Sequence, residues 1–132
     1  MTVEIVEDES GPYFRILGEK KPISVHVDFS RRTGIGLKTD LLARSIGYKK
    51  NSNLKVVDAT AGLCRDAFHL ACLGCDVTAV EENPKIFSVI SFHVNALSEK
   101  FKFNLVHEDS AKYLIELSEG EYPDVVYLDP MF

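Results

Sequence analysis

The order of apolar and polar residues changes character near residue 54. Before that point, β-rich runs at residues 3–6, 13–17 and 23–29 are separated by a Ser-Gly-Pro turn and by a second turn that ends in Lys-Lys-Pro. Short runs bounded by glycine and proline are typical of hairpin strands. They predict a small antiparallel β meander at the beginning of the chain.

From residue 54 onward, strand-like runs alternate with helical spacing. Mainly apolar runs at residues 54–58, 77–80, 103–106 and 125–128 predict strands, and the first run, which only Lys55 interrupts before Asp58, is typical of a strand covered on both faces. Helical spacing follows at residues 65–73, 84–97 and 110–118. This alternation predicts an α/β fold, a Rossmann-like sheet of about four parallel strands with right-handed crossovers.

Residues with capping chemistry mark the ends of the helices. Thr39 is a candidate cap for a further short helix that Gly47 ends, and Asn83 caps a helix that starts with Pro84. Glycine at position 74 ends the helix before it. In the last helix, the positions predicted to face inward are Ala111, Leu114 and Ile115.

Length and composition limit the class of protein. The 132 residues, 45% of them hydrophobic, suffice for one core of ordinary size. No run of 18 apolar residues occurs and the first residues lack the features of a signal peptide, so we expect a cytoplasmic location and no membrane insertion. We place a domain boundary between residues 38 and 39, with the meander and a basic loop before it and the α/β domain after it.

Charge and cysteine content narrow the chemistry further. The net charge of −5 argues against holding nucleic acid by bulk electrostatics, although it leaves room for a local basic face. Three cysteines fit a reducing compartment. Cys72 and Cys75 form a Cys-x-x-Cys without a second pair, at the end of a helix, which favours core cysteines over a redox or zinc site. We predict no metal site.

Polar residues follow each predicted strand of the parallel sheet. In such sheets the ligand lies outside the carboxyl ends of the strands. Glu81 follows Asp58 at roughly the 20-residue spacing at which an acidic residue takes the ribose hydroxyls of a nucleotide. The candidate cofactor-binding residues at these ends are Asp58, Thr60, Gly62, Arg65, Asp66, Glu81, Glu82, Asp109, Ser110 and Asp129. Taken singly, Asp109 or Ser110 is equally a helix cap, and Glu81 a surface charge.

The turn after the first strand of the sheet distinguishes between cofactors. It has one glycine, Gly62, where a pyrophosphate cofactor needs Gly-x-Gly-x-x-Gly, and its carboxylates at Asp58 and Asp66 repel phosphate. A dehydrogenase that uses NAD is therefore the less favoured interpretation. A cationic ligand such as S-adenosylmethionine fits better, with Arg65 paired to its carboxylate and Asp109 accepting from its adenine amine.

The chain ends with Asp129-Pro130-Met131-Phe132, which suits transfer to a nucleobase amine. The lone pair of an exocyclic amine is delocalised, so an enzyme has to hold its hydrogens and aim the nitrogen at the methyl group. Asp129 and the Pro130 carbonyl can accept those hydrogens, and Phe132 can stack on the base. A base in a duplex would have to be flipped out. An isolated Asp-Pro more often only ends a strand.

At these residues the chain resembles the RsmJ-type methyltransferases, which form 2-methylguanine in small-subunit ribosomal RNA with S-adenosylmethionine. The similarity rests on residues 58–68, 73–75 and 123–132, with weaker matches at 27–29 and 41–47. The resemblance implies ribosomal RNA or the small ribosomal subunit as partner. It also implies cofactor contacts from Arg65-Asp66, Glu81-Glu82, Asp109-Ser110 and Asp129.

The sequence departs from the family pattern at three places. Cys64 stands where the family usually has glycine, which is expected to crowd the cofactor turn, and Glu82 stands where arginine is common. The family continues beyond Phe132, so we expect a fragment whose fourth strand is an exposed edge open to self-association. Activity of this chain alone is left open.

Two further functions are compatible with the same residues. Related motifs of Asp or Asn, two prolines and an aromatic residue serve methyltransferases that act on adenine in DNA or on a glutamine amide of a protein. A non-catalytic nucleotide-binding module whose open edge docks on a partner is the third possibility.

Overall fold

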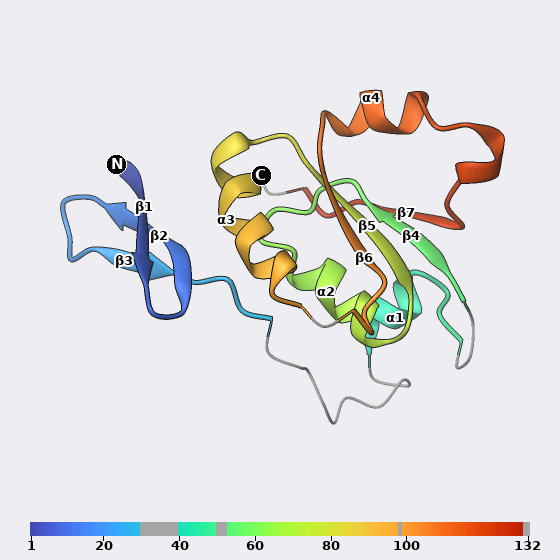
Figure 1. The fold of residues 1–132 in the computed structure, drawn as a ribbon, viewed down its shortest axis with the longest axis horizontal. Helices are drawn as coiled ribbons and strands as arrows, with labels where there is room; N and C mark the ends of the chain where they lie inside the picture. The colour runs from blue at the N-terminus through green and yellow to red at the C-terminus, as the bar shows by residue number, and fades with distance from the viewer. Residues whose placement is uncertain (30–39, 50–52, 98, 131–132) are drawn as a thin grey trace.

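The structure is a computed structural model that describes residues 1–29, 40–49, 53–97 and 99–130, and it contains two sheets (Figure 1). The first is the predicted antiparallel meander, in the order β1-β2-β3, built from β1 (Thr2–Asp8), β2 (Gly11–Leu17) and β3 (Ile23–Val25). The third strand ends four residues before the predicted end. Residues 26–29 leave the sheet, and the Phe29 ring packs 4.8 Å from that of Phe68.

The second sheet is parallel, in the order β6-β5-β4-β7. Its strands are β4 (Lys55–Asp58), β5 (Asp76–Glu81), β6 (Phe103–His107) and β7 (Val125–Tyr127). This confirms the predicted parallel sheet, with the strand before the glycine turn in its middle. Among the described residues β7 pairs only with β4, so β7 is an edge of the sheet.

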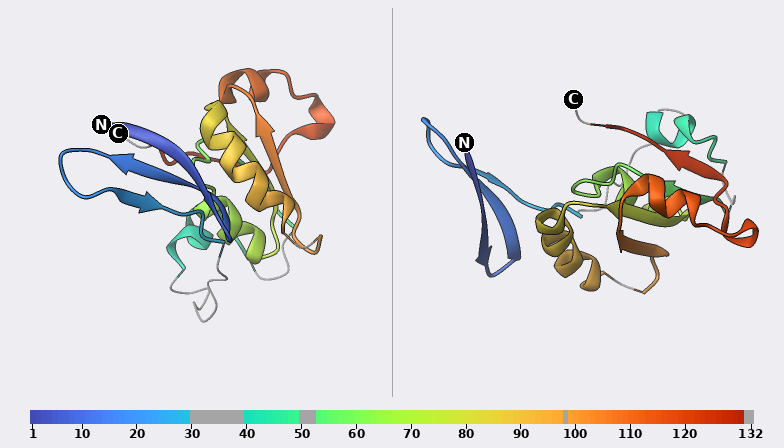
Figure 2. Two further views of the ribbon diagram at one scale, coloured as in Figure 1. Left: turned by 60° about the vertical axis from the view of Figure 1, so that its left-hand side comes forward. Right: turned by 90° about the horizontal axis from the view of Figure 1, so that it is seen from above.

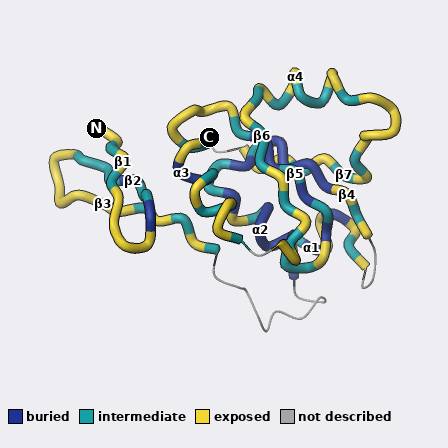
Figure 3. Tube along the Cα trace, viewed as in Figure 1, coloured by how far each residue is buried: buried dark blue, intermediate teal, exposed yellow. Residues whose placement is uncertain are grey.

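Helices cover the two faces of the parallel sheet unequally. They are α1 (Leu41–Ser45), α2 (Arg65–Cys72), α3 (Pro84–Asn95), α4 (Ser110–Ile115) and a 3-10 turn, η1 (Glu119–Glu121). The buried core lies between the sheet and α2 and α3, and includes Val56, Leu70, Val77 and Ile90. Figure 3 shows the buried positions concentrated there, while most of the meander is exposed or intermediate.

Helix α3 lies between the two sheets (Figures 1 and 2). Its His93 Nε2 donates to the Pro12 carbonyl of β2 at 2.9 Å. Gly11, also in β2, has φ +103° and lies against the Phe92 ring, where an added Cβ would be 2.4 Å from Cε1. Glycine is therefore required for the meander to approach α3 this closely.

Several predicted features of the helices are confirmed. Asn83 caps α3 by accepting from the backbone N–H groups of Lys85 and Ile86, with Pro84 as the first helical residue. Gly74 has φ +100° directly after α2. Among the cysteines, Cys64 and Cys75 are buried and Cys72 is partly buried, and no disulfide joins them. None of the described helices is long and apolar enough to cross a bilayer.

Other predictions at the helices were wrong. The cap of α1 is Asp40, whose Oδ1 accepts from the Ala43 N–H at 2.9 Å, and the predicted cap Thr39 lies outside the described residues. Helix α4 ends at Ile115 instead of residue 118, and Ile115 is 81% exposed rather than inward. The chain turns early because Ser118 and Glu121 form a capping box that starts η1. Ala111 is also exposed.

The boundary predicted between residues 38 and 39, and the basic loop before it, also fall outside the described residues.

A buried pair joins α1 to α2. Asp40 Oδ2 lies 2.5 Å from His69 Nε2, and both side chains are about 95% buried. Burial opposes ionisation of Asp40, but hydrogen bonds from Ala43 and His69 outweigh it and lower the pKa of the carboxyl group. One carboxylate thus caps a helix and holds it against its neighbour.

We expect Asp40→Ala to lower the free energy of unfolding by about 3–5 kcal/mol, because it leaves a buried His69 unpaired. Asp109→Ala is the matched control, since Asp109 caps α4 through the Lys112 N–H at 2.9 Å but is exposed. Its loss should be about 1 kcal/mol. Urea denaturation of both variants measures the difference, and equal losses would contradict this account of Asp40.

Candidate functional site

A cavity of about 520 Å³ opens at the carboxyl end of β4. Six residues predicted from the sequence line it together, namely Asp58, Thr60, Gly62, Arg65, Asp66 and Asp129. They come from β4, from the β4–α2 loop (residues 59–64), from the start of α2 and from the segment after β7. The sheet order accounts for this, because β7 pairs beside β4 and both strands end at the same edge.

The β4–α2 loop is bonded to the ends of the other three strands. Towards β7, Ala59 N–H donates to the Tyr127 carbonyl at 3.1 Å, and Asp129 N–H donates to Thr60 Oγ1 at 2.7 Å. Beyond β6, Ser110 Oγ donates to the Ala59 carbonyl at 2.5 Å. These contacts fix the loop that forms the floor of the cavity.

Glu81, at the end of β5, is held by two backbone groups. Its Oε2 accepts from the Gly62 N–H at 3.0 Å and its Oε1 accepts from the Asn83 N–H at 3.0 Å. Gly62 has φ +51°, in the left-handed region that glycine adopts at little cost. Glu81 thus joins the loop to the start of α3, and each carboxylate oxygen keeps a lone pair for another donor.

Five predicted residues that the structure describes lie outside the lining of this cavity, and Glu81 is one of them. Glu82 is exposed, and its carbonyl accepts from His107 Nε2. Asp109 caps α4 and Ser110 bonds to Ala59, so both have the structural roles that single residues at those positions commonly have. Pro130 is exposed beside Asp129. Phe132 lies outside the described residues, so its stacking role stays a prediction.

Asp58 is the most buried charged group of the cavity, at 2% exposure. Burial raises the pKa of its carboxyl group to about 6, and the nearby charges of Asp66 and Asp129 raise it further against hydrogen bonds from Thr60. Three carboxylates therefore share one cavity and repel one another. A cation bound between them would offset both the free-energy cost of burying the Asp58 charge and the repulsion among the three carboxylates.

Opposite charges lie side by side at the start of α2. Asp66 accepts a hydrogen bond from the Tyr127 hydroxyl at 2.8 Å. Arg65 next to it is exposed, lines the cavity, and forms no ion pair with a described residue. An adjacent guanidinium and carboxylate suit a ligand that carries both an anionic and a cationic group, such as an amino acid.

Sequence reasoning missed five residues of the lining, namely Val25, Ala61, Leu63, Ile86 and Tyr127. Tyr127 lies in the recognised motif before Asp129, but a tyrosine in a strand is usually only a packing residue. Ile86 lies in the helical spacing of residues 84–97, and Val25 lies in a strand-like run of the meander. Their place at the cavity depends on how the meander and α3 fold back, which no local pattern encodes.

Cys64 does not line the cavity, contrary to the expectation that it crowds the cofactor turn. It has φ +59° and is fully buried in the core below the loop. Burial raises the pKa of its thiol, with Asp58 and Glu81 adding to the effect, so the thiol stays protonated. The left-handed backbone conformation of Cys64 is strained, whereas its buried side chain stabilises the fold by filling a core position.

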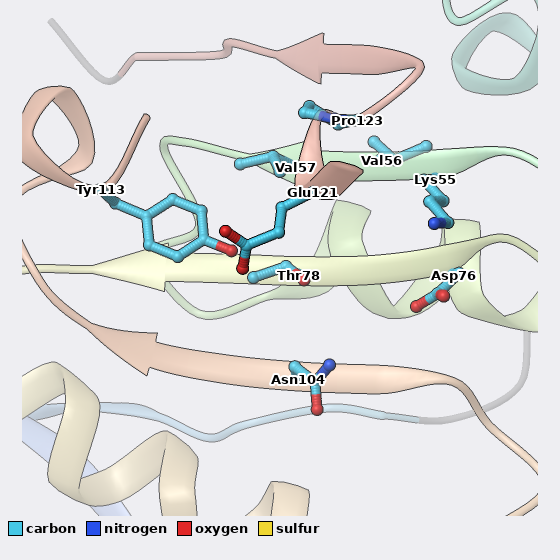
Figure 4. Close-up of a pocket in the computed structure, with 9 residues that line it drawn as sticks. All are labelled: Lys55, Val56, Val57, Asp76, Thr78, Asn104, Tyr113, Glu121 and Pro123. Atoms are coloured by element: carbon cyan, nitrogen blue, oxygen red, sulfur yellow. The ribbon is translucent and has the colours of Figure 1, made fainter. Parts of the chain in front are cut away.

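A second cavity, of about 150 Å³, lies on the face of the sheet that α4 and η1 cover (Figure 4). Tyr113 and Glu121 reach over Thr78 of β5, while Lys55 and Asp76 lie at the starts of their strands (Figure 4). This cavity holds none of the predicted site residues. We therefore take the cavity at the carboxyl end of β4 as the functional site.

A family model described as "Putative SAM-dependent methyltransferase" matches residues 4–132. The chain belongs to this family. The site fits that membership, because its carboxylates and single-glycine turn suit a cationic cofactor better than a phosphate. The family and the RsmJ resemblance predicted from the sequence are confirmed.

Individual relatives agree. Ribosomal RNA small subunit methyltransferase J of Cellvibrio japonicus is 36% identical over 146 residues, covering 97% of this chain and 55% of the relative. The protein of the same name from Shewanella sediminis is 40% identical over 128 residues, covering 86% and 49%. The chain spans about half the length of these curated relatives.

The fold is also found among solved structures. The crystal structure of a SAM-dependent methyltransferase from Neisseria gonorrhoeae superposes with a TM-score of 0.70 and 34% identity, covering 92% of this chain and 53% of that one. The predicted Rossmann-like methyltransferase sheet is thereby confirmed.

The raised pKa of Asp58 predicts a pH-dependent stability. A carboxyl group whose pKa is about 6 when folded and 3.8 when unfolded stabilises the fold below pH 3.8, and this is lost as pH rises through 6. The total is about 3 kcal/mol. Asp58→Asn should therefore stabilise the ligand-free protein more at pH 7.5 than at pH 4.5, as measured by urea denaturation.

Asp76→Asn provides the charge control, because it removes one negative charge from the neighbouring strand at the opposite end of the sheet. Its effect is subtracted at each pH. The account of Asp58 fails if the remaining difference does not grow between pH 4.5 and 7.5.

Proposed function

We propose that this chain is the cofactor-binding part of an S-adenosylmethionine-dependent methyltransferase that modifies the exocyclic amine of a guanine in small-subunit ribosomal RNA. The observation that carries the proposal is the grouping of Asp58, Asp66 and Asp129 around one cavity, with Arg65 beside them. Fold, family and relatives agree with it.

The residues of the cavity fit the charge of the cofactor. A sulfonium and an ammonium group suit the three carboxylates, and Arg65, which lines the same cavity, would pair with the methionine carboxylate. Glu81 keeps a free lone pair on each oxygen for the ribose hydroxyls. The roles of Glu82, Asp109 and Ser110 at the adenosine end belong to the same proposal. The bound cofactor supplies an electrophilic methyl group.

We assign the binding of the acceptor amine to the segment that follows β7. The Asp129 N–H donates to Thr60 Oγ1, and this hydrogen bond holds the backbone of Asp129 against the β4–α2 loop. Asp129 and the Pro130 carbonyl would accept the two amine hydrogens, and the carboxylate would stabilise the positive charge that develops on nitrogen. Phe132 completes this proposal as the stacking residue.

The partner in this proposal is the small ribosomal subunit or its RNA, and we expect a cytoplasmic location. Relatives that bear the name ribosomal RNA small subunit methyltransferase J support the partner. With a net charge of −5, contacts to phosphate would be local to a basic face. Pairing of two copies along the β7 edge also stays a prediction.

Calorimetric titration tests the cofactor. We expect S-adenosylhomocysteine to bind and NADH not to bind, because the single-glycine turn and its carboxylates exclude a pyrophosphate. Binding of NADH alone would overturn the proposal.

Transfer of a labelled methyl group tests the reaction, on small-subunit particles, DNA and protein in parallel. Asp129→Asn should lower kcat by about 100-fold or more, a loss well beyond any loss of S-adenosylhomocysteine affinity, since the main contribution of its carboxylate is made in the transition state. Asp124→Asn is the matched control on the other end of β7, where it accepts from the Lys55 N–H. Label in DNA or protein, but not in RNA, would reject the proposed substrate.

A further inference from the structure

Tyr127 joins the edge of the sheet to the start of α2. It is the last residue of β7, it pairs with Asp58 in the ladder, and its carbonyl accepts from the Ala59 N–H. Its hydroxyl donates to Asp66 Oδ2 at 2.8 Å. Both side chains line the cavity at the end of β4. The backbone of Tyr127 is therefore fixed by β4, and its hydroxyl fixes the carboxylate of another element.

The hydroxyl of Tyr127 is the only donor from the described residues to Asp66. It occupies one oxygen of the carboxylate, so the other oxygen is left to accept from a ligand. Burial raises the pKa of Tyr127, and the charges of Asp66, Asp129 and Asp58 raise it further, so the phenol stays protonated and donates at neutral pH. A donor at this place also offsets the repulsion that Asp66 meets from the other two carboxylates.

The geometry assigns Tyr127 as a positioning residue that orients Asp66 toward the ammonium group at the amino-acid end of the cofactor. This inference rests on the proposed function. Arg65, adjacent to Asp66, supplies the complementary charge for the carboxylate of the same amino-acid group. Together the three side chains would distinguish a thionucleoside that carries an amino acid from one that does not.

Two ligands separate these contributions. S-adenosylhomocysteine carries the amino-acid group, whereas 5′-methylthioadenosine has the same thionucleoside without it. Tyr127→Phe keeps the ring and removes the hydroxyl. Because a hydrogen bond to a charged group contributes more than a neutral one, we expect S-adenosylhomocysteine to bind Tyr127→Phe about 10-fold more weakly and 5′-methylthioadenosine within about twofold of the wild type.

Tyr113→Phe is the matched control. Tyr113 lies in α4 at the cavity on the other face of the sheet (Figure 4) and does not line the functional site. Its loss of a phenol hydroxyl should leave both affinities unchanged. A general loss of stability in Tyr127→Phe would weaken both ligands together, which the comparison of ligands detects.

The pairing with Asp66 is tested by a double-mutant cycle. Asp66→Asn should weaken S-adenosylhomocysteine selectively, and Tyr127→Phe should add less than twofold in that background, because the two residues act as one unit. Additive losses, or an equal loss for both ligands, would overturn the role of Tyr127. If Tyr127→Phe does not fold, Asp66→Asn still tests the proposal, because an equal loss of both ligands would mean that Asp66 does not bind the amino-acid group.

The outcomes also separate the two proposals. A wild-type protein that binds neither ligand rejects the proposed function. A wild-type protein that binds S-adenosylhomocysteine, with Tyr127→Phe binding it equally well, rejects only the role of Tyr127.

Discussion

The bonding of the β4–α2 loop to its neighbours is the constraint on which the site depends. Backbone or hydroxyl groups of Ala59, Thr60 and Gly62 meet partners from β7, α4 and the end of β5. Small side chains allow this approach, since Ala59 and Ala61 are both buried. Carboxylates that repel one another can share a cavity only where the backbone cannot relax away from them. The loop provides that rigidity from several directions at once.

Most of the architecture could be predicted from the sequence because its signals are local. The run before Asp58 is apolar except at Lys55, and Asn83-Pro84 combines a cap with a residue preset for the first helical turn. The fourth strand was expected to be an exposed edge, and among the described residues β7 pairs only with β4. The predictions for α4 were weaker. Its apolar spacing at Leu114 and Ile115 predicted a longer helix with Ile115 inward, but Ile115 is exposed and a capping box at Ser118 starts a separate turn.

The site was predictable in its members and less so in its contacts. Asp58, Asp66 and Asp129 were identified because they follow strands, and strand ends meet at one edge. The hydrogen bond from Tyr127 to Asp66 joins residues 61 positions apart, and the bond from Gly62 to Glu81 gives that carboxylate a structural partner beside the ribose contact or surface position expected for it. Such contacts depend on side-chain directions across different elements. Spacing along the chain does not encode them.

The place of α3 between the two sheets couples parts of the molecule that are distant in sequence. Its first turn contributes Ile86 to the cavity, and two turns later His93 holds the carbonyl of Pro12. A tilt of α3, a helix of 12 residues, at its contact with the meander would also displace Ile86. A partner that bound the meander and tilted α3 would therefore also change the wall of the cavity at Ile86.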